Sequence, residues 1–560
     1  MQTARRLYAY LISGISIGAL VIGINMLLTV LFERLGLGPS GDFLFGGEDA
    51  IRQQLTLASA VTAVSLPVWL IHWSIAERSV RPDRPGASLE RTSAVRGLYF
   101  ALALGGLLLA AASGVATTLE ATLLRLAGGE EFGYRSIGGG LALALVAGAA
   151  WAYHVRLRTR DWSRGPMTGA GAWLPRSYLY VAMFGGLMVM LGGIVGFIEL
   201  LGRLILDEAP VFADASTGSW WVAPLASGLT GVTVGGAVWL GHAAYAGGLV
   251  RDSGWRGASE RPAKLRLAYY VAAVIATAGA TIYLVGEGAG NALATALGVA
   301  DTDGAGRTIG AILFPILSAG VYAIAWWMHA RWMEREAALA SAERIETEDR
   351  LQLYPVVLVG LAFGATATAW LIGIVIDVLF GGDRVLSGGD QWRRELAQFV
   401  PFALLGFAAW IWRWNGVSAR WAVDPVGEAS STTRRVTLLI VLAAGIGAAV
   451  VSSGFILYRL FGSIFGLAQA GDPVSELSLL LGVLLVAIGV TIYHLRQLRR
   501  DQSLRAGVDS SPPEEAAAVP STSLRLTGPA GADTASMVAA LRRHLPVGFA
   551  LEVVEPDTDG

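Results

Sequence analysis

An uncharged apolar block at the start of the chain limits what it can fold into. The segment from Leu7 to Phe32 contains no charged residue, and comparable blocks recur along the whole sequence. About 20 such residues in a helix cross the hydrocarbon core of a bilayer. Charged residues make up 15% of the chain, whereas soluble domains contain about 25%. The sequence therefore predicts an all-α polytopic membrane protein.

A Trp-x-x-His motif recurs at the ends of alternate apolar blocks. Four copies are complete: Trp69 and His72, Trp151 and His154, Trp239 and His242, and Trp326 and His329. Two later copies are degenerate, with Trp410 before Arg413 and Thr491 before His494. Successive copies are 81 to 88 residues apart. A period this steady is typical of a tandem repeat.

A second marker divides the chain in the same way. Some 65 residues before each motif, an Arg precedes the start of an apolar block: Arg5, Arg96, Arg176, Arg266, Arg350 and Arg434. Each unit then reads as an Arg-led helix, an outer loop, and a second helix that ends at the motif. Six units of two helices predict about 12 transmembrane helices arranged as six tandem hairpins.

The predicted boundaries follow from these markers. We expect hairpins at residues 1–90, 91–170, 171–260, 261–345, 346–430 and 431–503. A Pro- and Ser-containing linker at 504–522 is expected to be flexible, and residues 523–560 read as a small cytoplasmic β-α-β segment.

The distribution of Lys and Arg predicts the orientation. The N-terminus and the five linkers between hairpins hold 25 of them, the C-terminal tail holds 7, and the loops within hairpins hold 10. Cytoplasmic segments are the ones enriched in Lys and Arg. We therefore expect both termini on the cytoplasmic side of a bacterial inner membrane, with every Trp-x-x-His motif at the inner interface.

The motif histidines admit three interpretations. Trp and His one turn apart are typical of side chains that anchor a helix end among lipid headgroups, and we favour this interpretation. Imidazoles from different helices at one depth can also ligate haem iron, but Arg413 cannot. Lipid-headgroup or proton handling is the third, because Arg pairs with phosphate and His titrates near neutral pH.

Acidic residues near the outer ends of the first helices form a looser series, which includes Glu33, Glu120, Glu287 and Asp377. Glu199 is the best candidate for a functional intramembrane acid because apolar residues flank it on both sides. Arg203, one turn later, can pair with it. For most of the series, a position at the outer headgroups is the simpler interpretation.

Several functions lack support in the sequence. The chain has no Cys, which excludes disulfides, thiolate metal sites and iron–sulfur clusters, and its net charge of −1 gives no nucleic-acid footprint. No catalytic or nucleotide-binding motif is present, so we expect no enzyme activity, no metal and no cofactor.

A membrane scaffold or sensor that contacts lipids, with a possible protein partner at the C-terminal tail, is favoured. A transporter for a small solute is the alternative, and a haem b electron-transfer protein is the third.

The Arg-led Tyr starts and the "PVWLIHW" end of the first unit resemble a family of bacterial membrane domains of unknown function. The resemblance covers about residues 5–500 and weakens in the fifth and sixth units, where Arg413 and Thr491 replace His and Trp. It implies tandem helical hairpins in a bacterial membrane. It implies no activity, substrate or catalytic residue.

Overall fold

The structure is a computed structural model of the chain. It describes residues 2–38, 48–127, 136–165, 169–206, 220–300, 304–337, 342–380, 389–465 and 473–509. The described residues up to Leu504 form one compact unit.

Helices dominate the described residues, which contain no strand. Twelve helical spans are long and apolar enough to cross a membrane, as the apolar blocks predict. The first helices of the six hairpins are α1 (Gln2–Phe32), α4 (Ala94–Leu126), α6 (Gly169–Ile205), α10 (Lys264–Ala296), α12 (Ala342–Phe380) and α16 (Thr432–Ile464). The second helices are α2 (Glu48–Ser79), α5 (Ile137–Ser163), α7 (Val222–Thr230) continued by η4 (Gly231–Gly235) and α8 (Gly236–Arg251), α11 (Ala305–Ala337), α14 (Gln391–Val423) and α17 (Pro473–Asp509). A short π-helical turn, η1 (Glu33–Leu37), extends α1.

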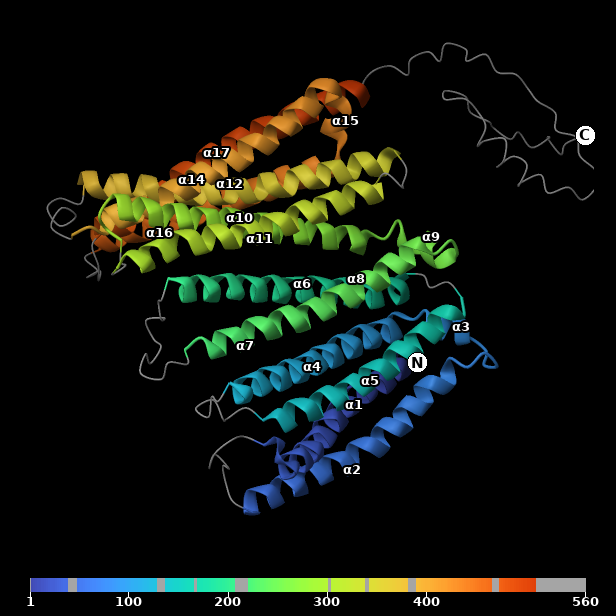
Figure 1. The fold of residues 1–560 in the computed structure, drawn as a ribbon. Helices are drawn as coiled ribbons and strands as arrows, with labels where there is room; N and C mark the ends of the chain where they lie inside the picture. Colours follow the sequence, from blue (N-terminus) through green and yellow to red (C-terminus); the bar gives the residue numbers. More distant parts are fainter. Residues whose placement is uncertain are drawn as a thin grey trace, which may run out of the picture. The chain divides into compact units, whose positions relative to one another are not determined.

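The first helices form a row along the compact unit. Each one contacts the first helix of the next hairpin, from α1 to α4, α6, α10, α12 and finally α16. Each of α1, α4, α6 and α10 also contacts the second helix of the hairpin that follows. Figure 1 shows the first four hairpins stacked in chain order, beginning with α1 and α2. The first helices therefore supply most of the contacts between hairpins.

Linkers with a short helix alternate with linkers that have none in the described residues. The structural repeat is therefore two hairpins long rather than one. Short helices α3 (Ala87–Arg91), α9 (Trp255–Glu260) and α15 (Pro425–Ser430) follow hairpins 1, 3 and 5. In Figure 1 these three helices lie at the same end of the bundle as the N-terminus. Hairpins 2 and 4 are followed by linkers without such a helix in the described residues. Four helices thus form a module: hairpins 1 and 2, hairpins 3 and 4, and hairpins 5 and 6.

Small residues bring the helices of one hairpin together. A Cβ atom added at Gly114 on α4 would lie 2.4 Å from the backbone nitrogen of Ala144 on α5. A Cβ at Gly406 on α14 would lie 2.3 Å from the nitrogen of Gly364 on α12. Helix backbones in direct contact are typical of membrane proteins, where small residues permit the close packing that stabilises association. The apolar side chains that remain exposed, such as Leu102 and Val181, suit a lipid environment.

The predicted β-α-β segment at 523–560 and the linker at 504–522 lie outside the described residues, apart from the end of α17.

Candidate functional site

Each module contains a cluster of buried Arg and acidic side chains at the end of the bundle where the first helices begin. We call these three groups the charge clusters. In the second hairpin of each module, the leading Arg pairs with an acid on its own second helix: Arg96 with Asp161, Arg266 with Glu336, and Arg434 with Asp501. In the first hairpin, the leading Arg pairs with a Glu of the short linker helix: Arg6 with Glu90, Arg176 with Glu260, and Arg350 with Glu428.

A Tyr one turn after the first Arg joins the two hairpins of a module. The Tyr10 hydroxyl accepts a hydrogen bond from Nη1 of Arg96 at 2.9 Å and lies 3.4 Å from Oε1 of Glu90. Tyr354 repeats this pattern in the third module, between Arg434 and Glu428. In the first and third modules, one Tyr hydroxyl therefore contacts charged groups of two successive hairpins.

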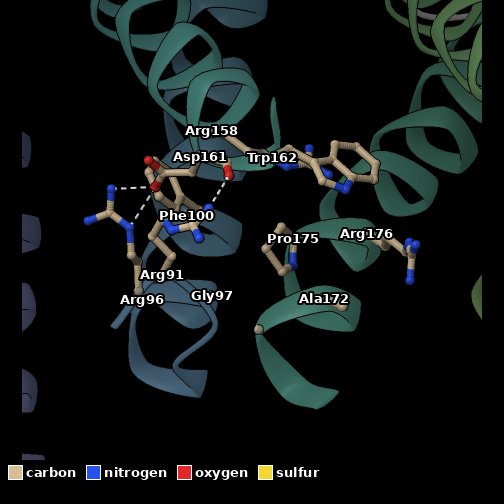
Figure 2. Close-up of a pocket in the computed structure, with 11 residues that line it drawn as sticks. Arg91, Arg96, Gly97, Phe100, Arg158, Asp161, Trp162, Ala172, Pro175 and Arg176 are labelled. Carbon is tan, nitrogen blue, oxygen red and sulfur yellow. Dashed lines mark hydrogen bonds and ion pairs between the residues drawn. The ribbon is translucent and has the colours of Figure 1, made fainter. Parts of the chain in front are cut away.

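The first charge cluster is the largest of those described. The guanidinium of Arg96 donates to Asp161 at 2.5 and 2.8 Å and to Glu77 at 2.8 Å. Arg160 adds an ion pair to Glu77, and Arg91 donates to the backbone carbonyl of Asp161 at 3.2 Å. Figure 2 shows Arg91 and Arg96 converging on Asp161 from opposite sides. Each carboxylate of this group thus has Arg partners.

Burial makes this pairing a structural requirement. The side chains of Arg96 and Asp161 are each 1% exposed, as is the side chain of Glu428 in the third module. A buried charge costs several kcal/mol unless a counter-charge and hydrogen bonds compensate it. The paired charges are equal in number and opposite in sign, so the clusters leave little net charge to attract an ion.

A second set of polar contacts connects the Trp-x-x-His motifs of neighbouring hairpins. Trp151 Nε1 donates to the Tyr178 hydroxyl at 2.8 Å, and that hydroxyl lies 2.8 Å from Nε2 of His242. The same arrangement joins Trp239, Tyr269 and His329 at 3.0 and 2.9 Å. Each Tyr thus connects the motif of its own hairpin to the motif of the preceding one.

The backbone contact of each His fixes the direction of these hydrogen bonds. Nδ1 of His154 lies 2.7 Å from the carbonyl oxygen of Ala150, one turn earlier, and the other four motif histidines repeat this contact. A carbonyl oxygen only accepts, so Nδ1 carries the proton. Nε2 is then an acceptor, and the Tyr hydroxyl donates to it.

This arrangement does not fit haem ligation. An axial imidazole needs a free Nε2 or Nδ1 lone pair. In His72, His154, His242 and His329, Nδ1 is protonated and Nε2 accepts from a Tyr hydroxyl. A haem at any of these positions would have to displace the Tyr.

Three of the five motif histidines are buried, whereas a side chain that anchors a helix end among lipid headgroups is exposed on the helix surface. His154 and His329 are 0% exposed and His494 is 2% exposed, so these rings pack between helices. His72 and His242 are half-buried. For His154 and His329 the physical reason is the neighbouring Tyr, which provides the ring with a hydrogen-bond partner inside the bundle.

In the degenerate copies of the motif, in hairpins 5 and 6, the Tyr that contacts the motif is replaced as well. In hairpin 5, Gln352 stands where the first and third hairpins have Tyr8 and Tyr178, and Arg413 replaces the His. The Arg413 guanidinium instead lies 3.9 Å from the Trp412 ring. In hairpin 6, Thr437 replaces the Tyr, and Nε2 of the buried His494 has no hydrogen-bond partner among the described residues. Trp410 stacks on Trp414.

Glu199 lies apart from the charge clusters. It is near the other end of α6, six residues before Ile205, and its side chain is 49% exposed. As the spacing suggests, Arg203 pairs with it at 2.8 Å. Glu199 also lines an open cavity of about 470 Å³ between α6 and α7. The structure places it at a helix end.

The sequence prediction does not include the acids of the charge clusters, because they lie outside the apolar spans. Their signal is nevertheless readable. A Glu stands six residues before the leading Arg of hairpins 2, 4 and 6: Glu90 before Arg96, Glu260 before Arg266, and Glu428 before Arg434. An acid also stands seven residues after the motif His of hairpins 2, 4 and 6: Asp161, Glu336 and Asp501. In the first hairpin, Arg6 is the residue that pairs in this pattern, whereas the spacing pointed to Arg5.

Comparison with protein families identifies one family model that matches the chain. The family model described as "Domain of unknown function (DUF5671)" matches residues 6–149, 98–215, 176–320 and 350–489, which together cover most of the chain. The chain belongs to the DUF5671 family. Three of these matches begin at Arg6, Arg176 and Arg350, the leading Arg of each four-helix module. The DUF5671 domain therefore corresponds to the module rather than to the hairpin.

The remaining match, 98–215, begins in the second hairpin of the first module and reaches the end of α6. This offset is expected when the two hairpins of a DUF5671 module resemble each other. No curated protein and no solved structure matches the chain.

Proposed function

We propose that this DUF5671 protein is a non-enzymatic membrane scaffold or sensor module, with both termini on the cytoplasmic side of a bacterial inner membrane. One observation carries the proposal: backbone contacts hold the helices together in their middle portions. A Cβ at Gly193 on α6 would lie 2.5 Å from the nitrogen of Val232, and one at Gly360 on α12 would lie 2.7 Å from the nitrogen of Trp410. Such contacts leave no room for a central passage between these helices.

The buried charges support the same conclusion. A transporter usually keeps an intramembrane carboxylate available for its substrate or coupling ion. In the charge clusters, Asp161, Glu260 and Glu428 are bound by Arg side chains. These acids hold the hairpins together and are not positioned to exchange partners without breaking that contact.

A small-solute transporter is the second candidate, and one cavity favours it. A space of about 360 Å³ is lined by Glu287, Asn291, Arg394 and Gln398, between α10 and the start of α14. Asn291 lies five residues before the end of α10, so this cavity is at the loop end of the hairpins. Asn291 also donates to the carbonyl of Ala311 on α11 at 2.8 Å.

Labelling of single cysteines distinguishes the two functions, because the chain has no Cys of its own. Ala278 on α10 and Ala147 on α5 are both 0% exposed. We expect A278C and A147C to resist membrane-impermeant thiol reagents applied from either side, in energised and de-energised membranes. N291C and R335C, at opposite ends of their hairpins, are the positive controls. Labelling of A278C or A147C in either state would reveal an aqueous path and support the transporter instead.

The charge distribution supports the proposed orientation, since 25 of the 42 Lys and Arg residues precede or link the hairpins. Reporter fusions at positions 85 and 510 are expected to read cytoplasmic, and a fusion at position 45 periplasmic. A periplasmic signal at 510 would contradict this topology.

A further inference from the structure

A large apolar groove lies at the boundary between the first two modules. Its volume is about 620 Å³, and its walls are the second helices α5 and α8. Small and aliphatic side chains of α4 and α5 line it, among them Ala111, Val115 and Ala144, together with Val234 and Ala237. The π-helical turn η4 contributes to the wall through Val234. π-Helical turns inside α-helices are frequent at functional sites.

A single glycine explains why the groove is open here. Between α2 and α5, and between α11 and α14, the residue two positions after the motif Trp bridges the gap: Tyr153 contacts Trp69 of α2, and Trp412 contacts Trp326 of α11. In α8 that position is Gly241. A Cβ added at Gly241 would have no atom within 4 Å. The groove is therefore the space that an aromatic side chain fills at those two boundaries.

One end of the groove carries an uncompensated positive charge. Arg158 of α5 lines it, next to Thr159 of the same helix and Tyr245 of α8. In the described part of the chain, Arg158 makes a cation–π contact with Trp162, 5.4 Å from the ring centre, and no ion pair. Figure 2 shows Arg158 beside Trp162 on α5. This distinguishes Arg158 from the arginines of the charge clusters.

The acids near Arg158 are already paired with other arginines. Arg158 also lines a small adjoining cavity, which Arg91, Arg96 and Arg176 share with the single acid Asp161. Asp161 is already bound by Arg96, and Arg176 by Glu260. An anionic group at Arg158 would complete the local charge balance.

The groove is long enough to hold an acyl chain of one lipid leaflet. From Ala144 to Arg158, α5 rises about 21 Å at 1.5 Å per residue. Half of a hydrocarbon core about 30 Å thick measures about 15 Å, so an acyl chain can follow the groove while its headgroup stays at Arg158. A phosphate is the natural partner of a guanidinium at this level.

We propose that this groove binds one anionic phospholipid, with an acyl chain between α5 and α8 and the lipid phosphate on Arg158. The apolar walls favour an acyl chain, and the guanidinium of Arg158 favours a negatively charged headgroup over a zwitterionic one. The proposal does not depend on whether the protein is a scaffold or a transporter.

Native mass spectrometry of the full chain tests this site, using phosphatidylglycerol and phosphatidylethanolamine as probes. We expect the wild-type protein to retain one phosphatidylglycerol in preference to phosphatidylethanolamine. R158Q should weaken that binding about tenfold or more, because it removes the charged donor. R156Q is the matched control, since Arg156 is on the same helix, is exposed and does not line the groove. It should bind like the wild type.

A second variant tests the groove itself. G241W should abolish retention by filling the space, while its thermal unfolding stays close to that of the wild type, because no atom lies within 4 Å of an added Cβ. Equal binding by R158Q and R156Q, or unchanged binding by G241W, would overturn the proposal. Equal retention of the two lipids would also overturn it. Displacement of the lipid by millimolar inorganic phosphate would show that the ligand is a free anion rather than a lipid.

Discussion

Arg96 on α4 and Asp161 on α5 form a fully buried ion pair, with Nη2 and Oδ2 separated by 2.5 Å. The equivalent pair in the third module, Arg434 and Asp501, is equally buried, with each side chain 2% exposed. These pairs join the two helices of a hairpin near the ends that carry the linkers. We interpret them as the contacts that fix hairpin geometry in each DUF5671 module.

Replacing Asp161 by Asn should lower the stability of the folded protein substantially. The change leaves Arg96 with one fewer negative partner in a buried position, and breaking such pairs costs about 3–5 kcal/mol. The expected result is a clear fall in Tm, followed by intrinsic tryptophan fluorescence in detergent. D390N provides the control, because Asp390 pairs with Arg393 while both side chains are nearly half exposed. Exposed pairs contribute about 0–1 kcal/mol, so equal effects of the two substitutions would contradict this interpretation.

The motif histidines should differ in their tolerance of Arg, although hairpin 5 carries Arg413 naturally. His329 is 0% exposed between Tyr269 and its own helix backbone, so H329R forces a guanidinium into a space shaped for imidazole. We expect H329R to reduce the yield of folded protein strongly. H72R should be tolerated, since His72 is half-buried and belongs to the terminal hairpin. Gel filtration of the two variants checks this, and a well-folded H329R would favour the headgroup-anchor interpretation.

Adjacent glycines on α6 offer a test of close helix packing. A Cβ at Gly186 would lie 2.7 Å from the backbone nitrogen of Trp239, so G186A must push α8 away. Overpacking of this kind costs about 1–3 kcal/mol. A Cβ at Gly185 has no atom within 4 Å, and G185A should be neutral or slightly stabilising because Ala favours helix. A drop in Tm for G185A as large as that for G186A would argue against the close contact.

The sequence predicted the architecture better than the site. Uncharged blocks such as Leu7 to Phe32 can satisfy their backbone groups in a membrane only as helices, so the twelve spans were readable from length and apolarity. The side that His154 faces was not readable, because Trp151 and His154 share a helix face whether that face meets lipid or another helix. Only the position of Tyr99 on the neighbouring helix decides between these alternatives.

The groove beside Gly241 illustrates a second limit. The absence of an aromatic side chain at that position is visible in the sequence only after the six hairpins are aligned on their Trp-x-x-His motifs. Even then, a vacancy between α5 and α8 depends on how far apart these helices are held, which is a property of the packing of α4 and α6. By contrast, the acids of the charge clusters follow a regular spacing from Arg96, Arg266 and Arg434 and could have been found.

The most direct test of the central claim, that the chain is built from four-helix modules, compares chains that end after residues 167, 254 and 341. The first and third contain one and two complete modules. The second ends before Glu260 and leaves Arg176 and Tyr180 without their carboxylate. We predict that the chains ending at 167 and 341 give a monodisperse gel-filtration peak after detergent extraction and that the chain ending at 254 aggregates or is degraded. A chain ending at 254 that is as well folded as the one ending at 341 would contradict the modular account.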